Sequence, residues 1–229
     1  MQYKTILFDA DMTLLDFKAS EAACLEQTLR EYGYPCSSEI VCRYSEINDG
    51  YWKLFEQKEI TRETLLVARF VQLFKELGIE GDGDAFNQRY MEHMGSSAIL
   101  LDGAAELCRT LCKTHRLYII TNGNSRNQHR RLEKSGLNVY LEDIFISEEI
   151  GSQKPQVAFF DYVRANIPDW DARSTLVVGD SLTSDIQGAI NYGLDSCWFN
   201  PQRLPYTLSR PCTYEIHRLE DLEKVLYKK

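Results

Sequence analysis

Three short apolar runs constrain the fold of this chain more than any other feature of its sequence. They are TILF at residues 5–8, LYII at 117–120 and TLVVG at 175–179. None of them alternates with polar residues, and continuous runs of Val, Ile and Leu are typical of strands buried on both faces of a parallel sheet. A fourth candidate strand is DIFIS at 143–147.

Helical patterns follow these runs and complete the prediction of the fold class. One covers residues 124–135 and another 184–193, with Gly193 expected at the end of the second. A third is expected to begin at Pro155, because proline favours the first position of a helix. Strand–helix alternation of this kind predicts an α/β protein with a doubly wound parallel sheet.

The interval 17–98 has a different pattern. Four helical patterns fill it without a strand candidate between them, and Ser38 and Thr61 are expected to cap two of the helices. We therefore expect two domains. Residues 1–16 and 99–229 form an α/β core, and residues 17–98 form a small all-helical domain inserted after the first strand.

Composition narrows the classes of partner. The formal net charge is −8, which argues against a nucleic acid as partner. No apolar run approaches the ~20 residues that span a bilayer, so we expect no membrane partner, and Asp9 comes too early for a signal peptide. The seven cysteines are odd in number and include no CxxC, which favours reduced thiols in a cytoplasmic protein. The sequence predicts no particular oligomeric state.

Polar residues follow three of the predicted strands directly. In chain order they are Asp9, Asp11, Thr121, Asn122 and Asp180, with Asp185 in the helix that follows. Taken singly, each is equally well explained as a turn or helix-cap residue. In a doubly wound sheet, however, ligands bind outside the carboxyl ends of the strands. We therefore expect these residues to meet at one edge of the sheet.

The acidic members of this set predict a metal site. Two carboxylates at positions i and i+2, with a third from a distant strand end, suit Mg²⁺, which takes few protein oxygens and is completed by a substrate phosphate. A calcium-binding EF-hand fits poorly, since Thr13 stands where an oxygen-rich ligand is expected. Lys154 is open to two interpretations, a solvated surface charge or a member of the site.

The chain resembles the haloacid dehalogenase superfamily of phosphohydrolases along essentially its whole length. The family's DxDxT motif matches DADMT at 9–13, its Ser/Thr motif matches Thr121 in TNG, its lysine matches Lys154 in QKP, and its GDxxxxD motif matches GDSLTSD at 179–185. The resemblance implies that the helical insertion is a cap. One departure is Met12, where many members have Gly, and we expect it to alter the turn.

A closer resemblance is to bacterial pyrimidine 5′-nucleotidases of this superfamily. It is carried by ITNGNSRNQ, by the pattern RLExxGL at 131–137, by CWFN at 197–200 and by Asn48 with Trp52 in the insertion. It implies a nucleoside 5′-monophosphate substrate, pyrimidine preferred. Asn48 and Trp52 lie one helical turn apart and are the expected base contacts, although a tryptophan at such a position is more often a core residue of the cap.

The resemblance also implies a mechanism. Asp9 attacks phosphorus and forms an aspartyl-phosphate, while Asp11 is the general acid and base. Mg²⁺ is held by Asp9, by the backbone carbonyl of Asp11 and by Asp180, and Asp185 orients this shell. The phosphoryl oxygens are bound by Thr121, by the backbone N–H groups of Asn122 and Gly123, and by Lys154.

Several alternatives remain open at this point. From the same fold, they are a sugar-phosphate or other small-metabolite phosphatase, a β-phosphoglucomutase-like mutase and a dehalogenase. Asp11 and Asp180 count against the dehalogenase, which needs neither a second acid nor a metal cluster. A phospho-receiver is about half this length and has no place for the helical insertion. An inactive interaction module is expected to lack Asp9 or Lys154, and both are present.

Overall fold

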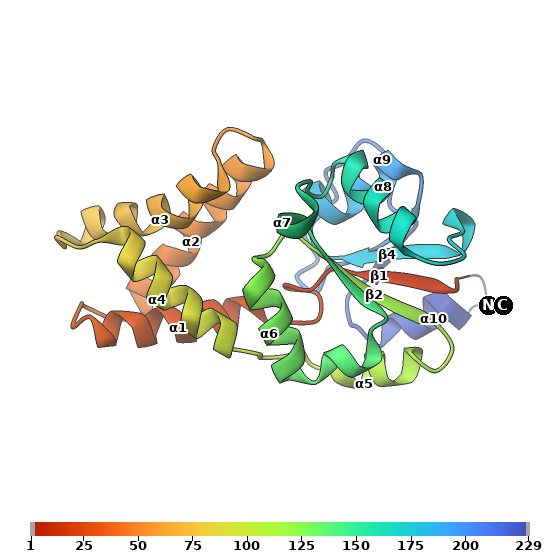
Figure 1. Ribbon diagram of the computed structural model, residues 1–229, viewed down its shortest axis with the longest axis horizontal. Coiled ribbons are helices and arrows are strands. Elements are labelled where there is room, and N and C mark those ends of the chain that lie inside the picture. Colours follow the sequence, from red (N-terminus) through yellow and green to blue (C-terminus); the bar gives the residue numbers. More distant parts are fainter. Residues whose placement is uncertain (1–2, 228–229) are drawn as a thin grey trace. The chain divides into compact units, whose positions relative to one another are not determined.

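A computed structural model of the chain describes residues 3–227 and divides them into two units (Figure 1). The first unit contains the described residues up to Asp16 together with those from Ala98 onward. The second unit is Phe17–Ser97. These bounds lie within one residue of the two predicted domains.

A six-stranded parallel sheet forms the centre of the first unit. Its strands are β1 Thr5–Phe8, β2 Arg116–Thr121, β3 Asp143–Ile146, β4 Thr175–Gly179, β5 Asp195–Phe199 and β6 Tyr214–Ile216. The strand order is β3-β2-β1-β4-β5-β6, and every neighbouring pair is parallel. From β1 the chain therefore adds β2 and β3 on one side of the sheet. It then returns and adds β4, β5 and β6 on the other side. The predicted doubly wound sheet is confirmed, and its switch point lies between β1 and β4.

Helices cover both faces of this sheet because successive strand residues point to opposite sides. Ile6 and Phe8 of β1 are buried with residues of α5 Ala104–Leu111, α6 Ser125–Ser135 and α10 Asp221–Tyr227. Leu7 lies between them in sequence and is buried on the other face with residues of α8 Val157–Asn166 and α9 Gln187–Tyr192. Figure 1 shows the two helical layers on either side of the strands. Each such fully buried side chain contributes about 1.5–3 kcal/mol to folding.

Two of the six strands were not predicted from the sequence. β5 begins with Asp and Ser, and β6 has three residues with a glutamate in the middle, so neither shows the continuous apolar run that identified the others. The short elements of this unit are α7 Ser147–Ile150, the 3-10 helices η1 Leu137–Tyr140 and η2 Ala172–Ser174, and the π-helix η3 Leu182–Ile186.

One predicted helix start is wrong, and one predicted helix is divided. Pro155 lies outside α8, which begins at Val157, and its carbonyl oxygen accepts a hydrogen bond from Asn191 of α9. The Lys154–Pro155 bond is cis. The pattern predicted over 184–193 is divided between η3 and α9 and ends, as expected, at the left-handed Gly193.

The second unit consists of α1 Phe17–Glu31, α2 Ser38–Glu56, α3 Arg62–Leu77 and α4 Gly83–Ser96. Its core is aromatic, and the rings of Tyr44 and Phe70 stack at 5.1 Å between centroids. Thr61 caps α3 as predicted. The cap of α2 is Ser37 and not Ser38, because Ser37 is the last extended residue and its hydroxyl accepts the N–H of Ile40.

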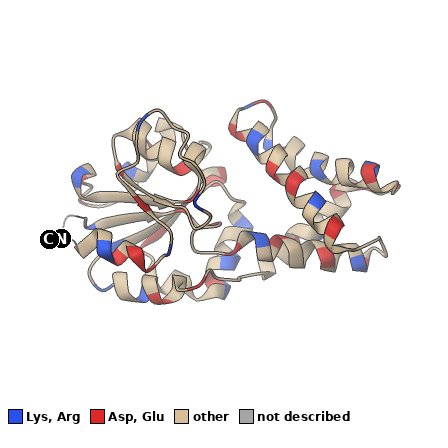
Figure 2. Ribbon diagram, turned by 180° about the vertical axis from the view of Figure 1, so that it is seen from behind, with Lys and Arg blue, Asp and Glu red and all other residues tan. Residues whose placement is uncertain are grey.

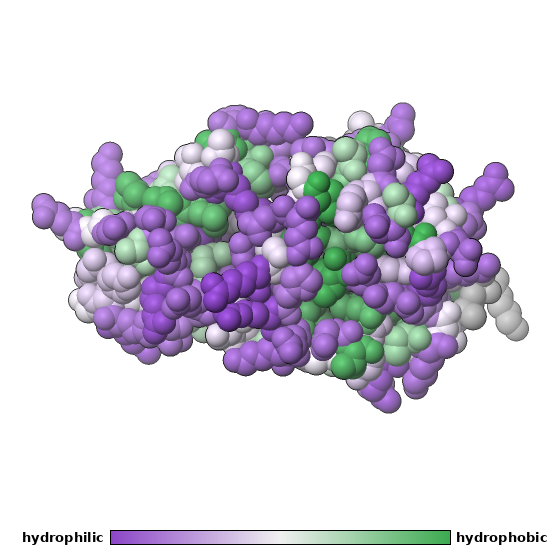
Figure 3. All heavy atoms as spheres, in the orientation of Figure 1, coloured by the Kyte–Doolittle hydropathy of each residue, from purple (hydrophilic) through white to green (hydrophobic). Residues whose placement is uncertain are grey.

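The surface carries mixed charges and scattered apolar residues. Figure 2 shows acidic and basic residues interspersed along the helices of each unit. The face drawn in Figure 3 is mainly hydrophilic, with small hydrophobic areas between the charged side chains. Among the described residues, no helix combines the length and the apolar character needed to cross a bilayer.

Candidate active site

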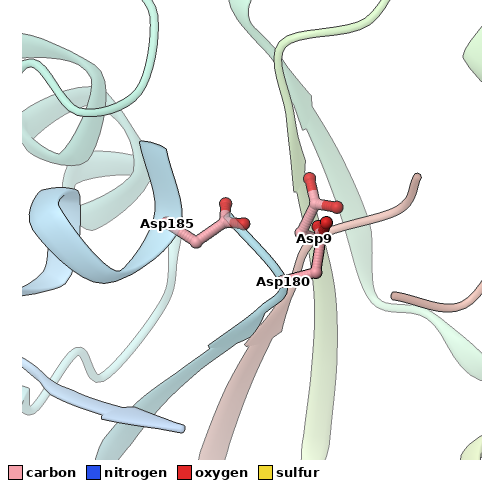
Figure 4. Close-up of side chains that lie close together, drawn as sticks. All are labelled: Asp9, Asp180 and Asp185. Atoms are coloured by element: carbon pink, nitrogen blue, oxygen red, sulfur yellow. The ribbon is translucent and has the colours of Figure 1, made fainter. Parts of the chain in front are cut away.

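The site lies at the switch point of the sheet, where β1 and β4 end side by side. Asp9 directly follows β1, and its backbone N–H donates to the carbonyl of Val178 in β4 at 2.8 Å. Asp180 directly follows β4, and Asp185 lies in η3. Figure 4 shows Asp9 and Asp180 at the ends of these strands, with Asp185 extending toward them from the neighbouring helical segment. One oxygen from each lies within 4.8 Å of the others.

Lys154 holds two of these carboxylates. Its ammonium donates to Asp9 Oδ1 at 2.7 Å, to Asp185 Oδ1 at 2.6 Å and to the carbonyl of Ile120 at 2.7 Å. Three acceptors match the three protons of an ammonium group, and the residue is only 1% exposed. The interpretation of Lys154 as a solvated surface charge is therefore wrong.

Burial shapes the protonation of this cluster. It raises the pKa of Asp9 to about 7, with Lys154 opposing the shift and Asp185 adding to it. Burial and the nearby charge of Asp9 raise the pKa of Asp180 well above its ordinary value. Burial alone would lower the pKa of Lys154, but Asp185 and Asp9 outweigh it and raise that pKa. Two carboxyls thus resist ionisation in the protein alone, and a bound cation reverses that balance.

Asp185 is fixed by its own turn. Its Oδ2 accepts the backbone N–H of Ser181 at 3.1 Å, so both of its oxygens are bound by protein donors. The carboxyl group packs against Gly179, where an added Cβ would lie 2.3 Å from Asp185 Cγ. Position 179 therefore requires glycine because of this close approach.

The turn after β1 brings a hydroxyl to the cluster. Thr13 Oγ1 lies 3.3 Å from Asp9 Oδ2 and 3.5 Å from Asp180 Oδ1. Met12 takes a left-handed conformation with φ of 62°, and its N–H donates to the carbonyl of Leu15. A side chain in this conformation costs roughly 1–2 kcal/mol. The turn is closed by this hydrogen bond with methionine in place, and the effect of Met12 on the turn stays a prediction.

The segment predicted to bind phosphate follows β2. Thr121 is buried, and its Oγ1 accepts the N–H of Gly123 at 3.0 Å. The side chain of Asn122 is paired with the backbone of Lys154: Oδ1 accepts the N–H and Nδ2 donates to the carbonyl, each at 3.0 Å. Asn122 therefore ties the end of β2 to the segment that carries the buried lysine.

The carboxylate of Asp11 contacts helix α6 and does not join this cluster of carboxylates. It accepts hydrogen bonds from Gln128 Nε2 and Arg131 Nη1, which both belong to α6. The structure thus brings together the side chains of Asp9, Asp180, Asp185 and Lys154, whereas that of Asp11 is held by a helix. Gln128 and Arg131 were not assigned a role from the sequence. A signal was available, since they lie three residues apart on the helix after TNG and therefore share a face.

Asn48 and Trp52 occupy different environments in the helical unit. Asn48 is fully buried; its Nδ2 donates to Glu21 Oε1 at 2.6 Å and its Oδ1 accepts from Arg69 Nη1 at 2.8 Å. Trp52 is half-buried and packs edge to face on Phe55. Within the unit, Asn48 bridges a buried carboxylate and a buried guanidinium.

The donor set suits a hard divalent cation. All the side-chain ligand atoms are carboxylate oxygens, the class that Mg²⁺ prefers. Asp185 and one oxygen of Asp9 already accept from N–H donors. The second oxygen of Asp9 and one oxygen of Asp180 accept long contacts from the hydroxyl of Thr13, at 3.3 and 3.5 Å. Asp9 and Asp180 are therefore the side chains best placed to bind a cation. Lys154 supports this pair, since it donates to Asp9 and is itself bound by Asp185.

Known proteins resemble this chain along its full length. YfnB of Bacillus subtilis, a HAD-hydrolase by name, is 42% identical over 98% of this chain and 96% of its own. A crystal structure of YfnB bound to magnesium, described as revealing interdomain movement, matches all of both chains with a TM-score of 0.96.

Two further relatives are named as nucleotidases. The pyrimidine 5′-nucleotidase PynA of Streptococcus pneumoniae is 40% identical and is matched over all of this chain and 97% of its own. The pyrimidine 5′-nucleotidase YjjG of Escherichia coli is 32% identical over the whole of both chains. The family model of haloacid dehalogenase-like hydrolases matches residues 6–199. The chain therefore belongs to the haloacid dehalogenase-like hydrolase family.

Proposed function

We propose that this hydrolase is a Mg²⁺-dependent phosphomonoesterase that acts through an aspartyl-phosphate and prefers pyrimidine nucleoside 5′-monophosphates. The observation that carries the proposal is the Asp9 carboxylate, held by Lys154 beside Asp180 at the switch point of the sheet. The names of two full-length relatives, both pyrimidine 5′-nucleotidases, support the substrate class.

In the first half of the reaction, Asp9 is the nucleophile. Its carboxylate oxygen forms a bond to phosphorus while the bond between phosphorus and the ester oxygen breaks. Asp11 gives a proton to the departing oxygen, which leaves as the alcohol of a nucleoside. Lys154 fixes the orientation of the Asp9 carboxylate by donating a hydrogen bond to its Oδ1.

In the second half, water replaces the nucleoside. Asp11 takes a proton from the water while the water oxygen attacks phosphorus, and the bond between phosphorus and Asp9 breaks. The products are inorganic phosphate and the original Asp9 carboxylate, so the cycle closes without a co-reactant.

Other groups bind the phosphoryl oxygens during both halves. We assign this role to Thr121, to the backbone N–H groups of Asn122 and Gly123, and to Lys154. In the structure the N–H of Gly123 is bonded to Thr121 Oγ1, and a bound phosphoryl oxygen competes with that contact. Asp9, Asp180 and the backbone carbonyl of Asp11 would hold Mg²⁺, which would supply positive charge against the same oxygens.

Specificity is assigned to the helical unit, acting as a cap. Trp52 supplies an aromatic surface, and Asn48 on the same helix is buried between Glu21 and Arg69; we propose both as determinants of the base. We also propose that the enzyme acts in the cytoplasm on a small molecule. Among the described residues, none of the seven cysteines forms a disulfide, which is typical of reducing compartments.

Phosphate release from a panel of about twenty phosphomonoesters tests the proposal. The panel contains pyrimidine and purine nucleoside monophosphates, sugar phosphates and 4-nitrophenyl phosphate, each with Mg²⁺ and with EDTA. We expect activity only with Mg²⁺, highest on uridine or thymidine monophosphate. Asp9→Asn should abolish it, whereas Asp161→Asn, at an exposed carboxylate of α8, should not.

The outcomes separate the parts of the proposal. Full activity of Asp9→Asn, or in EDTA, contradicts the mechanism. Sugar phosphates that are hydrolysed faster than every nucleotide contradict the substrate class and leave the mechanism standing. Conversion of a sugar phosphate to an isomer, without release of phosphate, identifies a mutase.

A further inference from the structure

Two buried side chains of helix α6 donate hydrogen bonds to the carboxylate of Asp11. Arg131 Nη1 donates to Asp11 Oδ1, and Gln128 Nε2 donates to Asp11 Oδ2. Gln128 and Arg131 are each 2% exposed, and Asp11 keeps 26% of its side chain exposed. Both oxygens of Asp11 are thereby fixed by a regular helix, and its solvent-facing side stays open.

A contact that served only to stabilise the fold would not need a buried guanidinium such as that of Arg131. Arg131 is among the largest fully buried side chains of the described residues. Withdrawing a guanidinium from water costs several kcal/mol, and an ion pair recovers that cost only with good geometry. Apolar side chains of similar volume commonly stabilise such a position as well or better. The buried charge therefore indicates a need for orientation at Asp11.

The side-chain amide of Gln128 is also oriented toward Asp11. The amide turns its NH₂ group to Asp11, because Nε2 donates to Asp11 Oδ2 and only the nitrogen of an amide can donate. Its Oε1 is buried and has no donor among the residues that the structure describes. An unpaired buried acceptor costs about 1–3 kcal/mol. The amide thus keeps its contact with Asp11 at the expense of its own second hydrogen bond.

Gln128 also connects Asp11 to the segment after β2. An added Cβ at Gly123 would lie 2.2 Å from Gln128 Nε2 and 2.6 Å from its Cγ. The side chain therefore fills the space beside Gly123 while it donates to Asp11. One residue thus sets the distance between the carboxylate and the segment assigned to phosphate binding.

We propose that Arg131 and Gln128 are positioning residues of the phosphatase reaction, which hold the Asp11 carboxyl where it exchanges a proton with the leaving oxygen. The inference rests on the proposed function, in which Asp11 is the general acid. Neither residue is assigned a contact with the substrate. Both act through Asp11. Their replacement should therefore slow the reaction most for a leaving group that needs a proton to depart.

The test compares two leaving groups. Nucleoside oxygen needs a proton to depart, whereas 4-nitrophenolate does not. Arg131→Met and Gln128→Met should lower kcat for uridine monophosphate by roughly 10²-fold, the lower end of general acid catalysis, with KM nearly unchanged. Their kcat for 4-nitrophenyl phosphate should fall much less. Arg131→Lys should recover part of the loss, and Arg130→Met, at the exposed neighbour on α6, should match the wild type.

A double-mutant cycle identifies Asp11 as the mediator. If the two residues act through Asp11, Arg131→Met adds no further loss for uridine monophosphate in the Asp11→Asn background. Equal losses on both substrates, or independent losses in the cycle, overturn the inference while the phosphatase assignment stands. A wild-type protein that hydrolyses neither substrate overturns the proposed function, and this inference with it. Thermal melting of each variant verifies that the protein compared is folded.

Discussion

The ammonium of Lys154 lies 2.7 Å from Asp9 and 2.6 Å from Asp185, and it joins two carboxylates that are otherwise buried without a cation. Asp9 comes from the end of β1 and Asp185 from η3 after β4, so the lysine connects the two halves of the doubly wound sheet at their switch point. The orientation of Asp9, the proposed nucleophile, and the local stability therefore depend on the same group.

Replacing this lysine should reduce stability and activity together. Lys154→Met leaves two buried carboxylates without their cation, and removal of one partner of a buried ion pair costs about 3–5 kcal/mol. The loss should be larger at pH 8 than at pH 5, because protonation relieves the unpaired carboxyls. Urea unfolding in EDTA at both pH values measures it. Lys113→Met, at an exposed lysine, is the control, and an equal effect of the two variants contradicts the assigned role.

The raised pKa of Asp9 predicts a pH-dependent stability of the metal-free protein. The folded protein keeps the Asp9 proton up to a pKa of about 7, whereas an unfolded aspartate loses it near 3.9. Between these values the folded state binds more protons, so this contribution to stability is full below pH 4 and is lost as the pH rises to about 7.

Asp9→Asn isolates that contribution because asparagine does not titrate. The free energy of unfolding of Asp9→Asn, relative to the wild type, should rise between pH 4.5 and pH 7.5 by a few kcal/mol, since one unit of pKa difference corresponds to about 1.4 kcal/mol. Urea titrations in EDTA across this range give the difference. A difference that stays constant with pH would show that Asp9 is ionised throughout.

The sequence predicted this site well where the signal was local. The apolar run of β1 and the carboxylates after it are neighbours in the chain, and parallel strands bring such ends together by geometry. It missed Gln128 and Arg131 because they meet Asp11 across 117 and 120 residues. It also missed β6, whose three residues follow no apolar run and complete the sheet only through pairing with β5.

The helical unit shows a second limit of the same kind. Helical periodicity placed Asn48 and Trp52 on one face, but it did not show which side chain that face buries. The structure places Asn48 at zero exposure between Glu21 and Arg69. These two partners lie on α1 and α3, so the environment of Asn48 depends on packing among three helices.

Gly179 should be as sensitive as a catalytic residue although it has no side chain. A methyl group there would lie 2.3 Å from Asp185 Cγ and Oδ2, so Gly179→Ala must displace the carboxyl that holds Lys154. We expect activity to fall by at least tenfold and stability by about 1–3 kcal/mol, as for other overpacked sites.

Gly50→Ala is the matched control for this prediction. Gly50 lies within α2 with no atom near an added Cβ, so alanine should stabilise the protein by up to about 1 kcal/mol. Chemical denaturation and initial rates on 4-nitrophenyl phosphate measure both variants. Unchanged activity of Gly179→Ala would show that Asp185 can move without disturbing the site.

Asn48 and Asn87 offer a matched pair that separates base recognition from support of the helical unit. Arg69 donates to Asn48 at 2.8 Å and to Asn87 at 3.0 Å, and both amides are buried. Replacing either by alanine leaves buried partners unsatisfied and should cost about 1–3 kcal/mol of stability. Of these two asparagines, Asn48 alone is proposed as a determinant of the base. Asn48→Ala should therefore lower kcat/KM for uridine monophosphate while 4-nitrophenyl phosphate hydrolysis stays near normal.

The ratio of the two activities decides the role of Asn48. Discrimination between bases depends on polar groups that the wrong base leaves unpaired, since shape alone gives only about 1–3 kcal/mol. Asn87→Ala should leave the ratio at its wild-type value because that amide is assigned no contact with the base. If Asn48→Ala and Asn87→Ala lower both activities alike, Asn48 supports the fold by linking Arg69 to Glu21. Base preference then has to come from other residues of the helical unit, and Trp52 is the next to replace.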